Sequence, residues 1–471
     1  MYGCLLAFSQ GTTAGVAAQQ SSLPNIILIL ADNLGTGDLG CYGSKLHRTP
    51  NMDRMAAEGT RLTSFYVTSG VCTPSRASIM TGCYAQRINL HVSDTGKAVL
   101  QPVSPKGLHP DEVTIAEALK TRGYATACFG KWHLGDQPPF LPTRQGFDEF
   151  LGIPYSEDMV KEVRPEVWPE LPLMRGDKVI EAPVDCRKLT HLYTEAAVDF
   201  IRRHGEKPFF LYMPQARPGS TKVVHVSDEF RGKSKNGLYG DSVEELNWSL
   251  GEVLDELKKQ GLDENTLVLW TSDNGAVQRN PAQGSNAPYK GWGYSTSEGG
   301  MRMPCLIRWP GHVPAGRVCD DLLSTLDLLP TFAALAGAKV EDGRERDGFD
   351  ASASWLGKVD ARSAYDDTGF FYYHFDQLQA VRSGPWKLYL PLENPVRMGG
   401  KNQSAQVMAL YDVRNDVSEA NEMSTKRPEI VQQLLKLAEN ARVDIGDQGK
   451  LGSGRRAAGL VEKVTARVMG E

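Results

Sequence analysis

Four continuous apolar runs constrain the fold of this chain more than any other feature of its sequence. Each has the length of a strand, and none shows the alternation of a strand with one wet face. Their positions are Asn25–Ala31, Tyr124–Phe129, Pro208–Tyr212 and Thr266–Thr271. Three of them run into polar motifs. We therefore predict buried parallel strands with a site at their carboxyl ends, as in open α/β sheets.

Amphipathic segments between these runs predict the helices that cover the sheet. The segments are Glu112–Arg122, Leu189–His204, Gly237 to about Lys259, and Leu322–Ala336. The longest carries an apolar stripe at helical spacing, which indicates core packing and not a groove for a partner. Together these patterns predict a large, mostly parallel sheet between helices.

The pattern changes near Ala338, where short alternating segments replace the long apolar runs. These segments are Gly369–Phe375, Leu378–Ser383, Trp386–Leu390 and Leu410–Val413, and a helical segment, Pro428–Arg442, follows them. They predict a small four-stranded antiparallel sheet with a packed helix. We expect a catalytic domain over residues 25–337, this small subdomain over 338–447, and a flexible tail over 448–471.

One motif stands between the first and second of these runs. Cys72-Thr73-Pro74-Ser75-Arg76 is followed by Thr81-Gly82, with the glycine six residues after the arginine. Pro74 and Ser75 suit a turn that opens into a helix, and a helix N-terminus attracts anions. Arg76 carries a permanent charge that can hold an oxyanion. The alternative interpretation of Cys72 is an inert buried thiol.

A second motif, Gly130-Lys131-Trp132-His133-Leu134-Gly135, follows the strand that ends at Phe129. On an extended chain Lys131 and His133 point to the same side, so both can face one cleft. Imidazole suits proton transfer because its pKa lies near neutrality. A surface charge and a satisfied polar residue are the alternative interpretations.

These motifs, together with Ser272-Asp273-Asn274-Gly275 after the last run, resemble those of the type I sulfatases. The resemblance covers residues 25 to about 447 and implies an alkaline-phosphatase-like α/β fold. It implies that a separate maturation enzyme oxidises Cys72 to Cα-formylglycine, whose hydrate attacks sulfur in a sulfate ester. By the same resemblance Lys131 binds the sulfate and the formylglycine. His133 hydrogen-bonds the second hydroxyl and acts as base when sulfate is expelled.

The resemblance also implies a metal site. The family has two adjacent aspartates after the first strand, where this chain has Asp32 and Asn33, and Asp273 and Asn274 match its second pair of ligands. An all-oxygen set of this kind fits Ca²⁺ and, less well, Mg²⁺. Asn33 offers an oxygen without a charge, so we expect a reduced metal affinity. Helix or turn capping is the alternative role for an aspartate at a strand end.

Three positions depart from the family pattern. Asn33 replaces an aspartate, the usual histidine is missing near Gly219, and Gly293 stands where a lysine usually precedes Glu298 by five residues. Each change removes a charge or an acid. Loss of a general acid lowers the rate most for substrates with poor leaving groups. We therefore expect aryl sulfates to react better than sugar or alkyl sulfates.

Three other residues are candidates for binding the substrate. Arg217 precedes the position of the missing histidine, and Lys290 lies three residues before Gly293. Arg217 can bind an anion but cannot act as an acid near neutral pH. His374, in the C-terminal subdomain, is the third candidate, with a structural or surface role as the alternative interpretation.

Composition excludes several classes of protein. The 471 residues carry a formal net charge of −5, without the basic surplus of a nucleic-acid binder. No run of 18 apolar residues predicts a membrane span. The 8 cysteines show no zinc spacing. Residues 1–24 are a weak export leader or a disordered extension, and the family resemblance favours a periplasmic or secreted enzyme.

The expected function is therefore hydrolysis of an aryl or carbohydrate sulfate ester, and the substrate is a small molecule or a glycan. One alternative is a related hydrolase of phosphate or phosphonate esters that uses the same nucleophile. The other is a catalytically impaired protein that binds sulfated glycans, against which the intact Cys72, Arg76, Lys131 and His133 argue.

Overall fold

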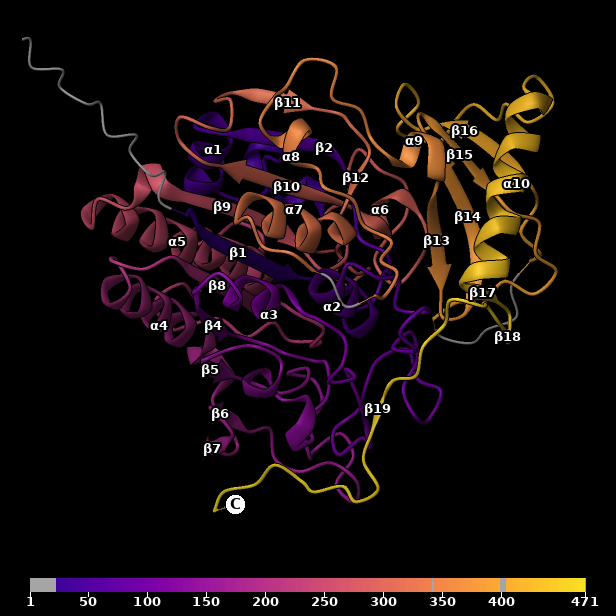
Figure 1. Ribbon diagram of the computed structural model, residues 1–471. Helices are drawn as coiled ribbons and strands as arrows, with labels where there is room; N and C mark the ends of the chain where they lie inside the picture. Colours follow the sequence, from indigo (N-terminus) through magenta and orange to yellow (C-terminus); the bar gives the residue numbers. More distant parts are fainter. Residues whose placement is uncertain (1–22, 341–342, 399–403, 471) are drawn as a thin grey trace, which may run out of the picture.

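The computed structural model describes residues 23–340, 343–398 and 404–470. A large sheet lies between two layers of helices, and a small sheet with its own helix lies at one side of it (Figure 1). The predicted leader lies outside the described residues except for residues 23–24. Among the described residues no helix is both long and apolar enough to cross a membrane.

The large sheet is mixed and mostly parallel, as predicted. Its central strands β9, β1, β8, β4 and β5 are parallel neighbours, and β10, β6 and β7 add antiparallel pairings on either side. The spatial order is β11 (Arg317–Cys319), β2 (Thr60–Tyr66), β10 (Arg302–Arg308), β9 (Thr266–Ser272), β1 (Asn25–Asp32), β8 (Phe209–Pro218), β4 (Ala125–Phe129), β5 (Glu149–Gly152), β6 (Leu173–Arg175) and β7 (Lys178–Glu181), with β12 (Leu323–Ser324) also paired to β2.

Strand β1 is buried on both faces, which explains its continuous apolar sequence. Successive side chains of a strand point to opposite faces. Ile26, Leu28 and Leu30 therefore join one core with α2 (Cys72–Thr81), α3 (Ile115–Lys120) and α7 (Leu328–Leu335). Ile27 and Ile29 join the other with α1 (Pro50–Ala57), α4 (Leu189–Arg203) and α5 (Gly237–Lys259).

Two helices begin later in the chain than the sequence predicted. Helix α3 begins only after Thr114, whose hydroxyl accepts from the Glu117 backbone N–H while the Glu117 carboxylate accepts from the Thr114 N–H. The helix predicted from Leu322 starts at Leu328, since the preceding residues form β12 and a 3₁₀ turn.

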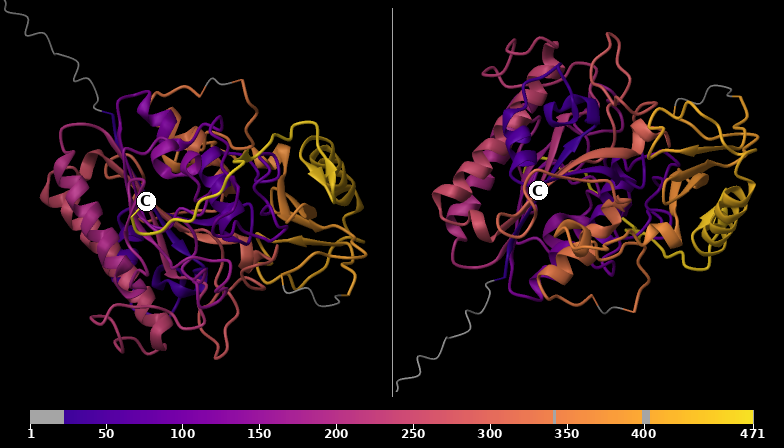
Figure 2. Two further views of the ribbon diagram at one scale, coloured as in Figure 1. Left: turned by 90° about the horizontal axis from the view of Figure 1, so that it is seen from below. Right: turned by 90° about the horizontal axis from the view of Figure 1, so that it is seen from above.

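The small C-terminal sheet is antiparallel and four-stranded, as predicted. Helix α10 (Pro428–Asp444) packs against it, on the side away from the large domain (Figure 2). Its strands are β13 (Phe370–His374), β14 (Gln377–Ser383), β15 (Trp386–Tyr389) and β16 (Ala409–Asp412). The short helices α8 (Ser352–Trp355) and α9 (Tyr365–Thr368) connect the two parts, with α8 packed on α7 and α9 on β14.

A buried ion pair joins the small sheet to the large domain. Lys387 on β15 lies 2.9 Å from Glu298, the first residue of α6 (Glu298–Met301) on the large domain. Tyr66 and Arg302 also contact this carboxylate. Burial alone would raise the pKa of Glu298, but Lys387 and Arg302 outweigh it and hold that pKa at about 2. The carboxylate therefore stays charged and keeps the subdomain docked.

The C-terminal segment, which we expected to fray from residue 448, instead has defined contacts. After the β17 (Gly446–Asp447) and β18 (Lys450–Leu451) hairpin, β19 (Gly459–Leu460) pairs with β3 (Lys106–Gly107) of the large domain. Arg456 lies 2.7 Å from the carboxylate of Glu112. Seen from below, the segment runs across the large domain (Figure 2). Backbone pairing and a charged contact therefore fix it.

Candidate active site

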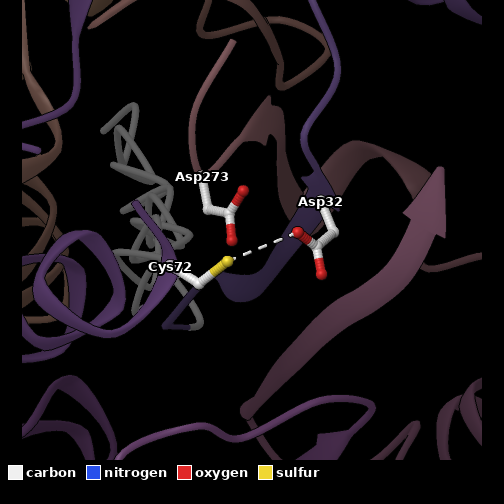
Figure 3. Close-up of side chains that lie close together, drawn as sticks. All are labelled: Asp32, Cys72 and Asp273. Atoms are coloured by element: carbon white, nitrogen blue, oxygen red, sulfur yellow. Dashed lines mark hydrogen bonds between the residues drawn. The ribbon is translucent and has the colours of Figure 1, made fainter. Parts of the chain in front are cut away.

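The carboxyl ends of β1 and β9 meet the first residue of α2. Because β1 and β9 are parallel neighbours, Asp32 and Asp273 emerge side by side. Cys72 faces them from α2, and one ligand atom from each of the three residues lies within 4.8 Å of the others (Figure 3). In the described part of the chain, no other group of three histidine, cysteine, aspartate or glutamate side chains lies close enough together to hold a metal ion.

Cys72 is buried at the N-terminus of α2. The sequence placed a turn before this helix, but the helix begins at Cys72 itself and ends at Gly82, whose φ is +68°. The Cys72 Sγ lies 3.6 Å from Asp32 Oδ1 and 4.0 Å from Asn274 Oδ1. Burial and the charge of Asp32 raise the pKa of this thiol well above its usual range. The unmodified residue is therefore a neutral thiol with little nucleophilic character.

Arg76 lies one helical turn after Cys72 and is fully buried. Its guanidinium donates to Asp273 Oδ2 at 3.0 Å and to the Lys131 carbonyl at 2.6 Å, and it lies 3.7 Å from Asp32. Arg76 thus balances the charge of the two aspartates and fixes the loop that carries Lys131.

Lys131 is the cation closest to the sulfur. Its Nζ lies 3.6 Å from Cys72 Sγ, 2.5 Å from Asp32 Oδ2 and 2.9 Å from Ser156 Oγ. Burial would lower the pKa of Lys131, but Asp32, Cys72 and Glu157 raise it well above its usual value. The side chain is therefore a fixed positive charge beside the Cys72 sulfur.

His133 is held in a left-handed backbone conformation, with φ at +62°, and is buried. Its Nε2 lies 3.1 Å from the Leu100 carbonyl, which can only accept, so Nε2 carries the proton. Nδ1 has no hydrogen-bond partner among the described residues and is left as a bare acceptor. Burial and the charges of Lys131 and Arg76 lower the pKa of His133 well below its usual value. The neutral ring can accept a proton only at Nδ1.

Four side chains offer oxygen atoms to a cation at the end of the sheet: Asp32, Asn33, Asp273 and Asn274. The Asn33 backbone N–H donates to Asp273 Oδ1 at 3.1 Å, and the Asn274 amide donates to the Asn33 amide oxygen. Burial and the charge of Asp273 raise the pKa of Asp32 to about 7. The two buried carboxylates and the two amide oxygens at these strand ends form a donor set that fits a hard divalent cation.

No contact in the described residues joins the three candidate substrate residues to Cys72 or Lys131. Arg217 is buried and donates to the carbonyls of Ala216 and Cys186. Lys290 is exposed on its loop. His374 is buried at the end of β13, where burial lowers its pKa to about 4. The expected roles of these three residues in binding therefore gain no support from their positions.

Two further hydroxyls were missed by sequence reasoning. Ser220 Oγ accepts from the Asn33 side-chain amide at 3.0 Å, and Tyr294 Oη lies 3.1 Å from the same oxygen. Each hydroxyl belongs to the residue directly after a departure from the family pattern, Gly219 or Gly293. That adjacency was the one signal in the sequence that could have identified them.

Two cavities adjoin the site and share Ser220, Thr221 and Lys222 in their walls. The first, about 970 Å³, has carboxylates in its lining. The second, about 660 Å³, is lined without any acidic residue. Tyr294 lies in the wall of the second cavity, so a molecule there would lie beside the hydroxyl pair.

Comparison with known proteins agrees with this geometry. The sulfatase family model matches residues 24–338, and the model of the C-terminal region of aryl-sulfatase matches residues 366–452. The chain belongs to the sulfatase family. This sulfatase is a hydrolase of sulfuric esters, as its motifs predicted, and its fold is the predicted alkaline-phosphatase-like α/β fold.

Several relatives of this sulfatase are similar over most of their length. The N-acetylgalactosamine-6-sulfatase of Canis lupus familiaris is 38% identical over 82% of this chain and 74% of its own length. Arylsulfatase A of Homo sapiens is 36% identical over 92% of this chain and 91% of its own. The crystal structure of Ps i-CgsB in complex with k-i-k-neocarrahexaose is 30% identical, with a TM-score of 0.77, and covers 92% of this chain and 95% of that chain.

Proposed function

We propose that this sulfatase hydrolyses sulfate esters of carbohydrates, with a formylglycine nucleophile derived from Cys72. The observation that carries the proposal is the position of Cys72 at the buried N-terminus of α2, between the Lys131 ammonium and the Asp32 carboxylate. A helix N-terminus and a fixed ammonium favour an anion at this place. When oxidised by a maturation enzyme, the residue supplies a hydroxyl nucleophile for sulfur.

The chain's own residues have distinct tasks in this proposal. Lys131 neutralises a sulfate oxygen next to position 72, and Arg76 keeps Asp273 and the Lys131 loop in place. His133 accepts a proton at Nδ1, because Nε2 is committed to the Leu100 carbonyl. Such groups act without reorganisation because they are already fixed before the substrate arrives.

The metal in this proposal is Ca²⁺, with Mg²⁺ as the alternative. Asp32, Asn33, Asp273 and Asn274 would hold it, and it would neutralise charge on the bound sulfate. An all-oxygen set with two carboxylates favours Ca²⁺, since Mg²⁺ keeps more of its water and demands stricter geometry.

The cavity charges support a carbohydrate substrate that enters from one side. In the lining of the larger cavity, carboxylates outnumber the cations Arg187 and Lys222, and this acidic surplus would repel a sulfated chain; the carboxylates are Glu157, Asp158, Glu162, Glu170 and Asp185. The smaller cavity has Lys222 and Arg279 as its charged residues, with Trp292 and several amides, and its volume suits a sugar. The relatives named for a sulfated amino sugar and bound to a carrageenan oligosaccharide favour the same class.

We further propose that the protein is secreted or periplasmic, because its substrate class lies outside the cell. Its maturation enzyme would act on Cys72 before α2 is buried, since the side chain is only 4% exposed in the folded chain. Fractionation of the native host, with detection of the protein by antibody, tests this location.

The function is tested by sulfate release from a panel of sulfated mono- and disaccharides, an aryl sulfate, a phosphate monoester and a phosphonate ester. The protein is produced together with the maturation enzyme, and the aldehyde at position 72 is quantified by mass. We expect sulfate esters to be hydrolysed and Cys72→Ala to be inactive. Faster release of phosphate or phosphonate at equal metal content would favour the rival hydrolase. Glycan binding without any release would favour the binding protein.

A further inference from the structure

Two of the departures from the family pattern, Gly219 and Gly293, leave no room for the histidine or lysine that is usual there unless neighbouring atoms move. Gly219 has a φ of +77°, and a Cβ there would lie 2.0 Å from the Glu157 carboxylate, which can move, and 2.8 Å from the backbone carbonyl oxygen of Ala216. A Cβ at Gly293 would lie 2.3 Å from the Gly275 carbonyl oxygen. These loops are therefore built around glycine, and histidine or lysine at these positions would require the backbone to move.

The next residue of each loop points a hydroxyl into the space beside the site. Ser220 and Tyr294, 74 residues apart in the chain, place their oxygens 3.1 Å from each other. Both line the cavity of about 660 Å³, and both are partly exposed. Each loop has thus exchanged an ionisable side chain at one position for a hydroxyl at the following one.

These hydroxyls extend a chain of hydrogen bonds that begins at the end of the sheet. The Asn274 amide donates to Asn33, and the Asn33 amide donates to Ser220 Oγ at 3.0 Å. Because an amide nitrogen only donates, the Ser220 oxygen is an acceptor there and its own proton is available to Tyr294. The Tyr294 proton is then left to donate into the cavity.

The backbone at Tyr294 is unusual for so large a residue. Its φ is +67°, a left-handed conformation that bulky side chains rarely adopt, and its N–H donates to the Gly70 carbonyl at 2.9 Å. Burial is the largest cause that raises the pKa of Tyr294. The hydroxyl therefore stays protonated. Backbone conformations of this kind cluster at functional sites, which makes Tyr294 a candidate for a role there.

We propose that the Tyr294 hydroxyl donates a hydrogen bond to the bridging oxygen of the sulfate ester, and that Ser220 is the residue that positions it. The inference rests on the proposed function, with sulfur at position 72 and the leaving group in the smaller cavity. The bridging oxygen joins those two places. The hydroxyl pair lines the smaller cavity and is hydrogen-bonded to Asn33, the neighbour in sequence of Asp32, which contacts Cys72. Charge that develops on the departing oxygen is then stabilised by a neutral donor in place of the missing histidine and lysine.

The test is the dependence of rate on the leaving group. Tyr294→Phe removes only the hydroxyl oxygen. We expect its kcat/KM to fall by roughly 10²-fold for an unactivated sugar sulfate and by less than about fivefold for an activated aryl sulfate. Tyr289→Phe is the matched control, because it also removes a tyrosine hydroxyl from this loop. That hydroxyl donates to the Thr63 carbonyl. A structural role for Tyr294 would lower both rates equally.

Equal losses on the two substrates, or no loss on either, would overturn the inference. If Tyr294→Phe fails to fold or to gain the aldehyde, Ser220→Ala decides. We expect that variant to lower the ratio of sugar to aryl kcat/KM severalfold, and an unchanged ratio would overturn the inference. If the matured wild type releases sulfate from neither substrate, the proposed function fails and this inference with it. If the wild type is active and the ratio of sugar to aryl kcat/KM is unchanged in both variants, only this inference fails and the proposed function stands.

Discussion

The ammonium nitrogen of Lys131 lies 3.6 Å from the sulfur of Cys72 and 2.5 Å from a carboxylate oxygen of Asp32. This arrangement places a permanent cation where the charge of a bound sulfate would lie. Lys131→Met keeps an unbranched side chain that is one atom shorter and removes the charge.

We expect Lys131→Met to lower kcat/KM by roughly 10²–10⁴-fold, since preorganised charge stabilisation in a buried site has effects of this size. Sulfate release is measured at equal aldehyde content at position 72. Lys120→Met, which breaks an exposed pair with Asp148, is the control and should remain active. Activity of Lys131→Met within tenfold of the wild type would contradict the proposed role.

The cation site should respond to charge at position 33. Asn33→Asp adds a second carboxylate after β1, and aspartate tolerates the local φ of +63°. We expect its Ca²⁺ affinity to rise roughly tenfold to a hundredfold, because the added charge lies in a buried site. Titration of chelator-treated protein, followed through the thermal unfolding midpoint, measures this affinity.

A matched control for Asn33→Asp is Asn89→Asp, another asparagine with a left-handed backbone, at φ +55°. It lies away from the strand ends and should leave the Ca²⁺ affinity unchanged. If both variants respond alike, or neither does, the four side chains at the ends of β1 and β9 do not form the cation site. Restoration of activity by Mg²⁺ better than by Ca²⁺ would replace the proposed metal.

His374 should make the stability of the protein depend on pH. Burial, with a smaller effect of Arg397, lowers its pKa to about 4 in the folded chain, whereas an unfolded histidine titrates near about 6.5. As the pH falls, the unfolded chain therefore binds the proton first. The free energy of unfolding should drop between about pH 6.5 and 4, by on the order of 3 kcal/mol from this residue.

His374→Gln should reduce that pH dependence while leaving stability at pH 8 closer to the wild type. Guanidinium unfolding at a series of pH values measures the difference. If wild type and variant lose stability in parallel between pH 6.5 and 4, the residue is not a buried neutral histidine.

Lys222 should govern the affinity for sulfated chains. It is exposed at the wall shared by the two cavities and lies beside the smaller, cationic one. We expect Lys222→Ala to raise KM severalfold for a multiply sulfated oligosaccharide, with little change for a small aryl sulfate. Lys178→Ala, an exposed lysine on β7, is the control. An equal change in KM for both substrates would argue against a glycan in the smaller cavity.

The parts of the fold that sequence predicted are those with local signals. The continuous apolar run of β1 predicted that both faces of this strand are buried, and Asp32 follows the run directly. The pairing of β1 with β9 was not visible as such, but two polar motifs at two strand ends implied that Asp32 and Asp273 would meet. The Cys72 and Lys131 motifs were recognised because each is continuous in sequence.

The parts that sequence reasoning missed depend on contacts between distant loops. Ser220 and Tyr294 are brought together by backbone geometry at Gly219 and Gly293, and no local pattern reports that geometry. Lys290, a candidate for binding the substrate, is exposed on its loop, and its role stays a prediction. The pairing of β19 with β3 joins two-residue strands, which are too short for any periodic signal.

The most direct test of the account is sulfate release from an activated aryl sulfate by protein with a confirmed aldehyde at position 72 and bound Ca²⁺, compared with Cys72→Ala. The geometry around Cys72, Lys131 and Asp32 predicts release that disappears in the variant. Absence of release from the matured protein, or release that persists in Cys72→Ala, would contradict the assignment of Cys72 as the source of the nucleophile.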